Sequence, residues 1–357
     1  MPENTFETLE SVADKIKSDL DSDPKKIGLL YAFNATGKTR LSSFFDDNES
    51  GEEKALIYSA FFEDLFVWDN REYVFNLDSD SKIINFISEQ GLENQITENF
   101  QRLTLGSKIF PLCSFAAGEV TFSYSPGDDR GKYNVKISRG EESLFVWSVF
   151  YTVLDTVISI LNTSAEDRET SEFNNLEYII IDDPVSSIDD TKIISMAVAL
   201  INLINSANND VKFLITTHHP LFYNILFNQF IRKKKAIPWV LFKDDTNFEL
   251  KEQGDDSPFG YHLALKDVIK KSIDSNSLQK YHFNLFRGLL EKTSNFLGYN
   301  NWTDCLEGES KEEIKKLVNL YSHGKLSELE SRHFPDEHKL LFTKVFNDFI
   351  ERFKWKA

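Results

Sequence analysis

Apolar and polar positions along the chain predict strands and helices in alternation. Residues 26–33 form an apolar run, and the stretch from Gly37 to Phe45 has helical spacing, which is typical of a strand, a turn and a helix. Further strands are expected at 55–60, 178–181, 211–216, 239–242 and 248–250, and helices at 141–161 and 189–207. This alternation favours an α/β fold.

Two segments of the same part are less regular. Residues 120–124 and 133–137 alternate on either side of a turn-forming stretch, so a β-hairpin is predicted there. Residues 61–112 carry aromatic and acidic patches in no clear order, and no elements are predicted for them.

The last part of the chain has a different pattern. Residues 254–260, rich in glycine, aspartate and proline, are the best linker candidate. Helices are expected beyond it at 261–273, 278–296, 312–321 and 338–353. We therefore predict an α/β domain over residues 1–252 and a smaller, mostly helical domain over residues 253–357.

The charge of the chain is strongly acidic but uneven. The 357 residues include 57 acidic and 40 basic ones, a formal net charge of −17. A protein that coats nucleic acid normally carries the opposite sign, because neutralised phosphates supply most of its affinity. From residue 248 onward the two signs are almost balanced. The charge thus disfavours a nonspecific polyanion binder, but not an enzyme that recognises one folded RNA loop.

Cysteine usage and hydropathy bear on the compartment. Cys113 and Cys305 are far apart, so neither a disulfide framework nor a zinc spacing is present. The first twenty residues are polar, and no secretory signal is expected. Residues 144–161 are apolar but contain Asp155, which favours a buried helix over a membrane span. A cytoplasmic protein with no membrane partner is expected.

Residues 32–39, Ala-Phe-Asn-Ala-Thr-Gly-Lys-Thr, fit a phosphate-binding loop in which Ala32 replaces the first glycine. Lys38 is expected to reach the β/γ oxygens of a nucleotide, and Thr39 to ligate Mg²⁺. A chance Gly-Lys-Thr is common, but a strand before it and a helix after it favour nucleotide binding. The expected nucleotide contacts are Asn34, Ala35, Thr36, Gly37, Lys38, Thr39 and Arg40.

A pair of acids follows the apolar strand at 178–181. Asp182 is expected to hold Mg²⁺ through water, and Asp183 to polarise the water that attacks the nucleotide. The simpler interpretation, a strand that meets a polar turn, would be preferred if the phosphate-binding loop were absent.

Three further segments complete an ordered set of motifs. They are Ser138-Arg139-Gly140-Glu141, Ser186-Ser187-Ile188-Asp189 and Thr216-Thr217-His218. The whole set resembles ABC-type ATPases, most of all stand-alone members such as the SMC-type repair ATPases. The resemblance implies that Ser138, Gly140 and Glu141 of one subunit close on the nucleotide of another. It also places Asp189 and His218 at the nucleotide, and implies a homodimer or a higher homo-oligomer.

The first of these segments has a second interpretation. Arg139 replaces a glycine of the ABC-type signature, and a Ser followed three residues later by Glu is also a capping box at a helix start. Both interpretations can hold together.

A closer resemblance extends over nearly the whole chain. It is carried by residues 31–34, 37–42, 63–66, 68–70, 140–143, 181–187, 261–263, 281–283, 291–293 and 296–299. At these residues the chain resembles the PrrC-type anticodon nucleases, in which an ABC-type ATPase domain is fused to a C-terminal ribonuclease domain. An alanine at the position of Ala32 belongs to the family pattern, whereas Ala35 stands where a glycine is expected. Because alanine resists positive φ, the geometry of the loop is expected to differ there.

The resemblance assigns a catalytic triad to Arg287, Glu291 and His323. Arg287 and Glu291 are four residues apart on an expected helix and share a face. A base, an acid and a cation suffice to cut RNA without a metal, leaving a 2′,3′-cyclic phosphate and a 5′-hydroxyl. Without the resemblance, a solvated ion pair and a histidine that caps a helix are the more common interpretations. His262 and His282 are interpreted as packing or hydrogen-bonding residues.

Recognition of the substrate is expected near the linker. The family uses an acidic residue to read the modified wobble base of lysine tRNA, and Asp255 is the matching position, with Asp256 as a nearby rival. The basic run at 232–235 is either a solvated loop or a contact to the tRNA backbone.

The expected function is therefore a nucleotide-gated nuclease of the anticodon loop of lysine tRNA, which uses ATP or GTP with Mg²⁺. The resemblance implies a latent toxin of antiphage defence held by a type I restriction–modification complex. Two alternatives remain open. One is an ABC-type ATPase sensor that signals to a separate effector nuclease, and the other is a non-enzymatic interaction module.

Overall fold

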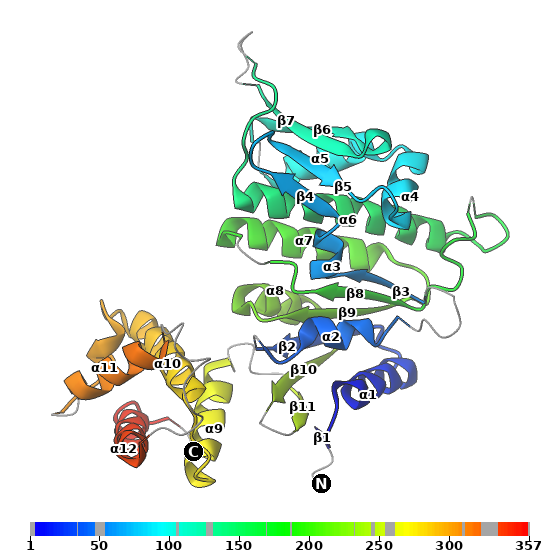
Figure 1. Ribbon diagram of the computed structural model, residues 1–357. Helices are drawn as coiled ribbons and strands as arrows, with labels where there is room; N and C mark the ends of the chain where they lie inside the picture. The colour runs from blue at the N-terminus through cyan, green and yellow to red at the C-terminus, as the bar shows by residue number, and fades with distance from the viewer. Residues whose placement is uncertain are drawn as a thin grey trace. The chain divides into compact units, whose positions relative to one another are not determined.

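The structure is a computed structural model that describes residues 4–33, 35–46, 54–104, 107–125, 131–168, 170–185, 188–231, 233–243, 247–253, 261–308, 311–322 and 335–355. The chain divides into two compact units, Met1–Pro258 and Phe259–Ala357. The first is mixed α/β, and the described part of the second is helical (Figure 1). The predicted fold class, an α/β part followed by a smaller, mostly helical one, is confirmed.

A seven-stranded sheet forms the centre of the first unit, in the order β1-β11-β10-β2-β9-β8-β3. Five neighbouring strands are parallel: β10 (Ala236–Lys243), β2 (Ile27–Ala32), β9 (Lys212–Thr217), β8 (Tyr178–Asp182) and β3 (Ala55–Tyr58). Beyond β10, β11 (Phe248–Glu252) pairs antiparallel with β10, and β1 (Thr5–Phe6) pairs antiparallel with β11. Every residue of β2 and β8 is buried, as expected of parallel strands covered on both faces.

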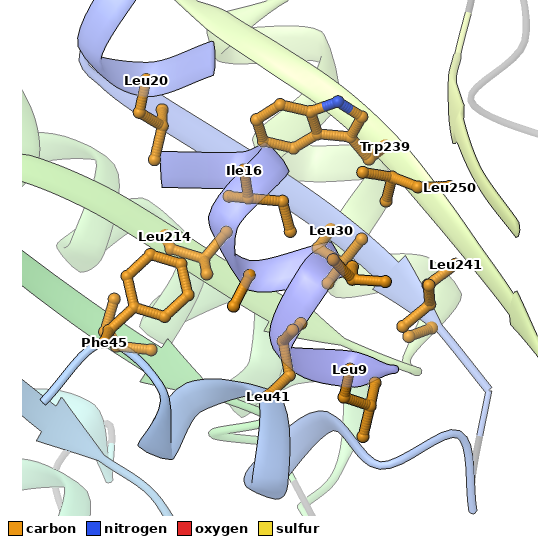
Figure 2. Close-up of a cluster of buried hydrophobic side chains, with 14 of the residues drawn as sticks. Leu9, Ile16, Leu20, Leu30, Leu41, Phe45, Leu214, Trp239, Leu241 and Leu250 are labelled. Carbon is orange, nitrogen blue, oxygen red and sulfur yellow. The ribbon is translucent and has the colours of Figure 1, made fainter. Parts of the chain in front are cut away.

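One face of the main sheet is covered by α1 (Leu9–Ser22) (Figure 2). The Thr8 side chain caps this helix, and its apolar side chains pack against Leu30, Leu214 and Trp239 of three different strands. The sequence interpretation missed α1, because its apolar positions lie within a strongly charged segment. It also missed α8 (Pro220–Phe230).

A second sheet, in the order β4-β5-β7-β6, is antiparallel. Its strands are β4 (Phe66–Asp69), β5 (Val74–Leu77), β6 (Ile109–Ser114) and β7 (Glu119–Tyr124). The segment for which no elements were predicted thus contributes three of these strands, together with α3 (Ala60–Glu63), α4 (Lys82–Gln90) and α5 (Glu93–Leu103).

The predicted hairpin is wrong about its second strand. β7 is present, but it pairs with β5 and β6, and the segment at 133–137 forms no strand. The returning segment contacts β7 through an isolated bridge between residue 132 and Tyr124 and a hydrogen bond from the Val135 N–H to the Phe122 carbonyl oxygen. The physical reason lies in packing: Phe122 of β7 contacts the rings of Phe75 and Phe145 in the core, whereas Tyr133 is 77% exposed.

The long helix α6 (Arg139–Asn162) packs on α5 and α7 (Asp190–Ser206), and Figure 1 shows α6 and α7 between the two sheets. By length and composition it could cross a membrane, but 78% of its apolar window is buried inside the unit. This burial supports the interpretation as a core helix.

The second unit is built around α10 (Tyr281–Leu297). Around it lie α9 (Tyr261–Asp274), the 3₁₀ turn η2 (Trp302–Cys305), α11 (Lys311–Ser322) and α12 (Asp336–Arg352). Phe283 and Phe286 of α10 pack in tilted and edge-to-face contacts against Phe342, Phe346 and Phe349 of α12. These contacts bury the face of α10 that carries Phe283 and Phe286 against α12.

Candidate nucleotide and ribonuclease sites

The predicted nucleotide residues gather where three parallel strands end. β2, β9 and β8 are neighbours in the sheet, so their carboxyl ends lie on one edge, the usual place for a ligand in such sheets. The phosphate-binding loop follows β2, Asp182 ends β8, and Thr217 ends β9.

Lys38 is the cation of this edge and is only 8% exposed. Its Nζ donates to the carbonyl oxygens of Ala32 at 3.2 Å and Phe33 at 3.4 Å, and pairs with Asp183 Oδ2 at 3.5 Å. Gly37, just before it, has φ +95°, and a Cβ there would lie 2.6 Å from Leu9. Glycine is therefore required at this turn.

Asp182 lies in direct contact with Thr39, the other predicted Mg²⁺ ligand. Its carboxylate is 4% exposed and accepts hydrogen bonds from Thr39 Oγ1 at 2.6 Å and from Thr216 Oγ1. Burial raises the pKa of Asp182 above its ordinary value, against the opposing effect of the two hydroxyl donors. A carboxylate beside a hydroxyl is a set of hard oxygen ligands that fits Mg²⁺.

Asp183 and His218, the two residues predicted to act in nucleotide hydrolysis, are hydrogen-bonded to each other. His218 Nδ1 contacts Asp183 Oδ2, and the backbone N–H of His218 donates to Oδ1 at 3.3 Å. Burial acts to raise the pKa of Asp183, but the hydrogen bond from His218 and the charge of Lys38 outweigh it and lower the pKa below its ordinary value. Asp183 thus stays ionised and orients the imidazole.

Asp183 also has an unusual backbone. Its φ is +51°, in the left-handed region that few side chains adopt, and its N–H donates to the carbonyl oxygen of Thr216 at 2.9 Å. Strained backbone of this kind is typical of functional sites.

Glu63 is a candidate site residue that sequence reasoning did not assign. It accepts a hydrogen bond from the buried hydroxyl of Tyr58 at 2.9 Å. Burial raises its pKa most, the Tyr58 hydrogen bond opposes this, and the charges of Asp182 and Asp183 raise the pKa further. The charges of Asp182 and Asp183 thus reach the Glu63 carboxyl group, which makes it a candidate third acidic group at this edge of the sheet. The signal was present, because Glu63 belongs to a segment shared with the PrrC-type family.

Other residues predicted to contact the nucleotide form hydrogen bonds within their own loop or helix end. The Thr36 hydroxyl donates to the Phe33 carbonyl at 2.7 Å. Ser138 caps α6 and shares a complete capping box with Glu141, and Asp189 caps α7. Among the described residues, no hydrogen bond joins Ser138 or Asp189 to the group around Lys38. Gly140 lies in the first turn of α6 and Arg40 in α2 (Lys38–Ser43), whereas Asn34 lies outside the described residues.

Ala35 adopts φ +65°, the left-handed conformation that the sequence predicts to be unfavourable for alanine. The Ala35→Gly variant is expected to be more stable by about 0.5–1 kcal/mol, because a left-handed L-residue costs roughly 1–2 kcal/mol and the added freedom of glycine in the unfolded chain offsets part of that. Scanning calorimetry of the full chain measures the change. Ala199→Gly, inside α7, is the matched control and should lose about 1 kcal/mol. An Ala35→Gly protein that melts below the wild type would contradict the strain.

In the second unit, two of the three predicted ribonuclease residues are described. Arg287 Nε donates to Glu291 Oε1 at 2.8 Å, within α10. Arg287 Nη1 donates to Asn319 Oδ1 of α11 at 3.1 Å, and its guanidinium lies 5.6 Å from the centre of the Trp302 ring. The pair is thus more than a solvated ion pair, because two other elements contact the arginine.

The remaining predicted residues are placed as follows. His323, Asp255 and Asp256 lie outside the described residues. His282 is 2% exposed and its Nδ1 accepts the Gln279 N–H at 2.9 Å, in agreement with the packing interpretation. The side chain of His262 is not among those described.

A curated anticodon nuclease of Escherichia coli is 41% identical to this chain over 335 residues, which cover 85% of this chain and 83% of that protein. The chain belongs to the anticodon nuclease family. The resemblance to the PrrC-type anticodon nucleases is thereby confirmed. No protein-family model matches this anticodon nuclease family member.

Two solved structures resemble part of this anticodon nuclease family member at low scores. The SMC head domain from Thermotoga maritima gives a TM-score of 0.32 at 14% identity and covers 64% of this chain and 90% of its own. The SmcHead bound to the C-winged helix domain of ScpA gives 0.31 at 12% identity, with 47% and 43% covered.

Proposed function

We propose that this protein is a nucleotide-gated endoribonuclease that cuts the anticodon loop of a tRNA. The observation that carries the proposal is the 41% identity to the Escherichia coli anticodon nuclease, whose 85% coverage exceeds what either unit of this chain contains alone. Lysine tRNA, cut near its wobble base, is the proposed substrate, with Asp255 as the residue that reads the base.

The ribonuclease residues are Arg287, Glu291 and His323. Cleavage requires removal of the proton from a 2′-hydroxyl, protonation of the leaving 5′-oxygen, and stabilisation of the charged phosphorane. Glu291 and His323 serve as the base and acid, and the Arg287 guanidinium, held at Glu291, faces the charge that develops. The products are a 2′,3′-cyclic phosphate and a 5′-hydroxyl, and no metal takes part in this step.

The nucleotide residues belong to the first unit. Lys38 binds the β/γ-phosphates of ATP or GTP, and Thr39 with Asp182 would hold Mg²⁺. The metal supplies charge neutralisation at the phosphates. Asp183, kept ionised and bonded to His218, polarises the attacking water.

A second copy of the chain completes the nucleotide site in this proposal. Ser138, Gly140 and Glu141 lie at the N-terminus of α6, a helix end suited to a phosphate, and Asp189 caps α7. Within one subunit, the described hydrogen bonds of Ser138 and Asp189 are made at their own helix ends. The nucleotide bound by a second copy is therefore their proposed ligand. The active form is therefore a homodimer or a higher homo-oligomer.

The cellular setting is part of the same proposal and rests on the family. A cytoplasmic ribonuclease that destroys a tRNA must be silent in healthy cells, which suits a latent toxin of antiphage defence. A type I restriction–modification complex is the proposed partner that keeps it silent.

The test is direct. The full-length protein is incubated with total tRNA, Mg²⁺ and ATP or GTP, and the tRNA is sequenced for cut sites. We expect one cut in an anticodon loop, with a cyclic phosphate that must be removed before the 3′ end can be tailed. The rate should fall when the nucleotide is omitted. Intact tRNA with every nucleotide would contradict the proposal and favour a sensor ATPase that signals to another nuclease.

A further inference from the structure

Arg287 is contacted by groups from three different elements of the second unit. Glu291 of α10 accepts from its Nε at 2.8 Å, and Asn319 of α11 accepts from its Nη1 at 3.1 Å. The Trp302 ring of η2 lies 5.6 Å from the guanidinium carbon. Two hydrogen bonds in the plane of the guanidinium and a ring beside it restrict the plane to one orientation.

Asn319 has a special place on its helix. It lies in the last turn of α11, which ends at Ser322, and His323 follows four residues after Asn319 in the sequence. The bond from Arg287 therefore ties α10 to the last turn of α11 through a residue with no assigned role.

Stability alone gives little reason for this bond. Asn319 is exposed, and a hydrogen bond between partly solvated groups contributes only about 1 kcal/mol. The orientation of a catalytic cation matters far more, because a misplacement of about 1 Å can reduce a rate by about 10²-fold.

We propose that Asn319 is a positioning residue for RNA cleavage that acts by fixing the guanidinium of Arg287, with the Trp302 ring as its support. The inference rests on the proposed function, in which Arg287 stabilises the phosphorane. Asn319 itself need not touch the RNA, so it should influence the chemical step and leave binding unchanged.

The experiment measures single-turnover cleavage of end-labelled lysine tRNA, isolated from cells, by the full-length protein with Mg²⁺ and ATP or GTP. Asn319→Ala is expected to lower the rate at saturating enzyme about tenfold, with the half-saturating enzyme concentration unchanged within about twofold. Asn319→Asp keeps an acceptor oxygen for Arg287 and should remain within about threefold of the wild type. Asn347→Ala, an exposed asparagine on α12, is the matched control.

A double variant separates positioning from an independent role. In an Arg287→Lys protein, which lacks the planar fork, Asn319→Ala should cause no further loss. A full additional loss would overturn the proposal, as would a wild-type rate for Asn319→Ala alone. An equal loss in Asn319→Ala and Asn319→Asp, with a lowered melting temperature in both, would show a structural role and also overturn it.

The outcome for Arg287→Ala distinguishes this inference from the proposed function. If Arg287→Ala is inactive and Asn319→Ala is fully active, the inference fails and the ribonuclease assignment stands. If Arg287→Ala cleaves at the wild-type rate, the ribonuclease assignment itself fails.

Discussion

Replacing His323 by alanine is expected to abolish cleavage of the anticodon loop while nucleotide hydrolysis continues. General acid–base catalysis by one side chain contributes about 10²–10⁴-fold, and no other residue of the proposed triad can take over proton transfer at that position. The measurement is the rate of tRNA cleavage by the purified variant, with release of inorganic phosphate recorded in the same reaction.

The second unit offers a matched histidine for this test. The Nδ1 atom of His338, in α12, lies 3.1 Å from the hydroxyl oxygen of Tyr321. Tyr321 stands two residues before His323 in the sequence. His338→Ala is expected to keep most of the activity. Loss of cleavage in His338→Ala together with full activity in His323→Ala would move the catalytic role to His338. Full activity in both would remove histidine from the proposed mechanism.

The Asp182→Asn and Lys38→Ala proteins are both expected to lose tRNA cleavage, although Arg287, Glu291 and His323 are unchanged. The asparagine side chain would keep the shape of the aspartate but lack the negative charge that Mg²⁺ requires. Lys38→Ala removes the cation that lies 3.5 Å from Asp183. Loss of one such electrostatic contact lowers activity by about 10²–10³-fold in enzymes. Cleavage of tRNA and binding of a fluorescent ATP or GTP analogue are the two readouts.

A second ion pair of the first unit serves as the control. Lys26 pairs with Asp210 at 2.7 Å, next to the start of β2 and so away from the strand ends that carry the nucleotide residues. Lys26→Ala and Asp210→Asn should cleave tRNA at close to the wild-type rate. If Lys38→Ala and Asp182→Asn also cleave normally, while nucleotide binding is lost, the nuclease is not gated by the nucleotide.

Much of the geometry of the candidate nucleotide site could be predicted from the sequence, because its residues stand at the ends of strands. The strand at 178–181 and the one at 211–216 are β8 and β9 with ends that differ by one residue. Parallel strands gather their carboxyl ends at one edge, and because β2, β9 and β8 are neighbours in the sheet, Lys38 and His218 both contact Asp183 there.

Contacts that depend on the pairing of distant segments could not be predicted in this way. Glu63 comes near Asp182 because β3 lies beside β8, with Tyr58 opposite Ile181, and no local pattern reveals that neighbour. Asn319 is an exposed polar residue on a helix, indistinguishable in sequence from a solvated one. The partner of β7 was missed for the same reason, since alternation indicates a strand but not its neighbour.

The pairing of β2 with β9 and β10 has a consequence for the order of synthesis. Residue 27 pairs with residues 213 and 236, so the strand that carries the phosphate-binding loop gains both neighbours only after most of the first unit has been made. At about 5–20 residues per second, the ribosome then needs several more seconds to complete the second unit. The first unit can thus fold before the second unit exists. In the proposed function, this order places the nucleotide control in position before the ribonuclease.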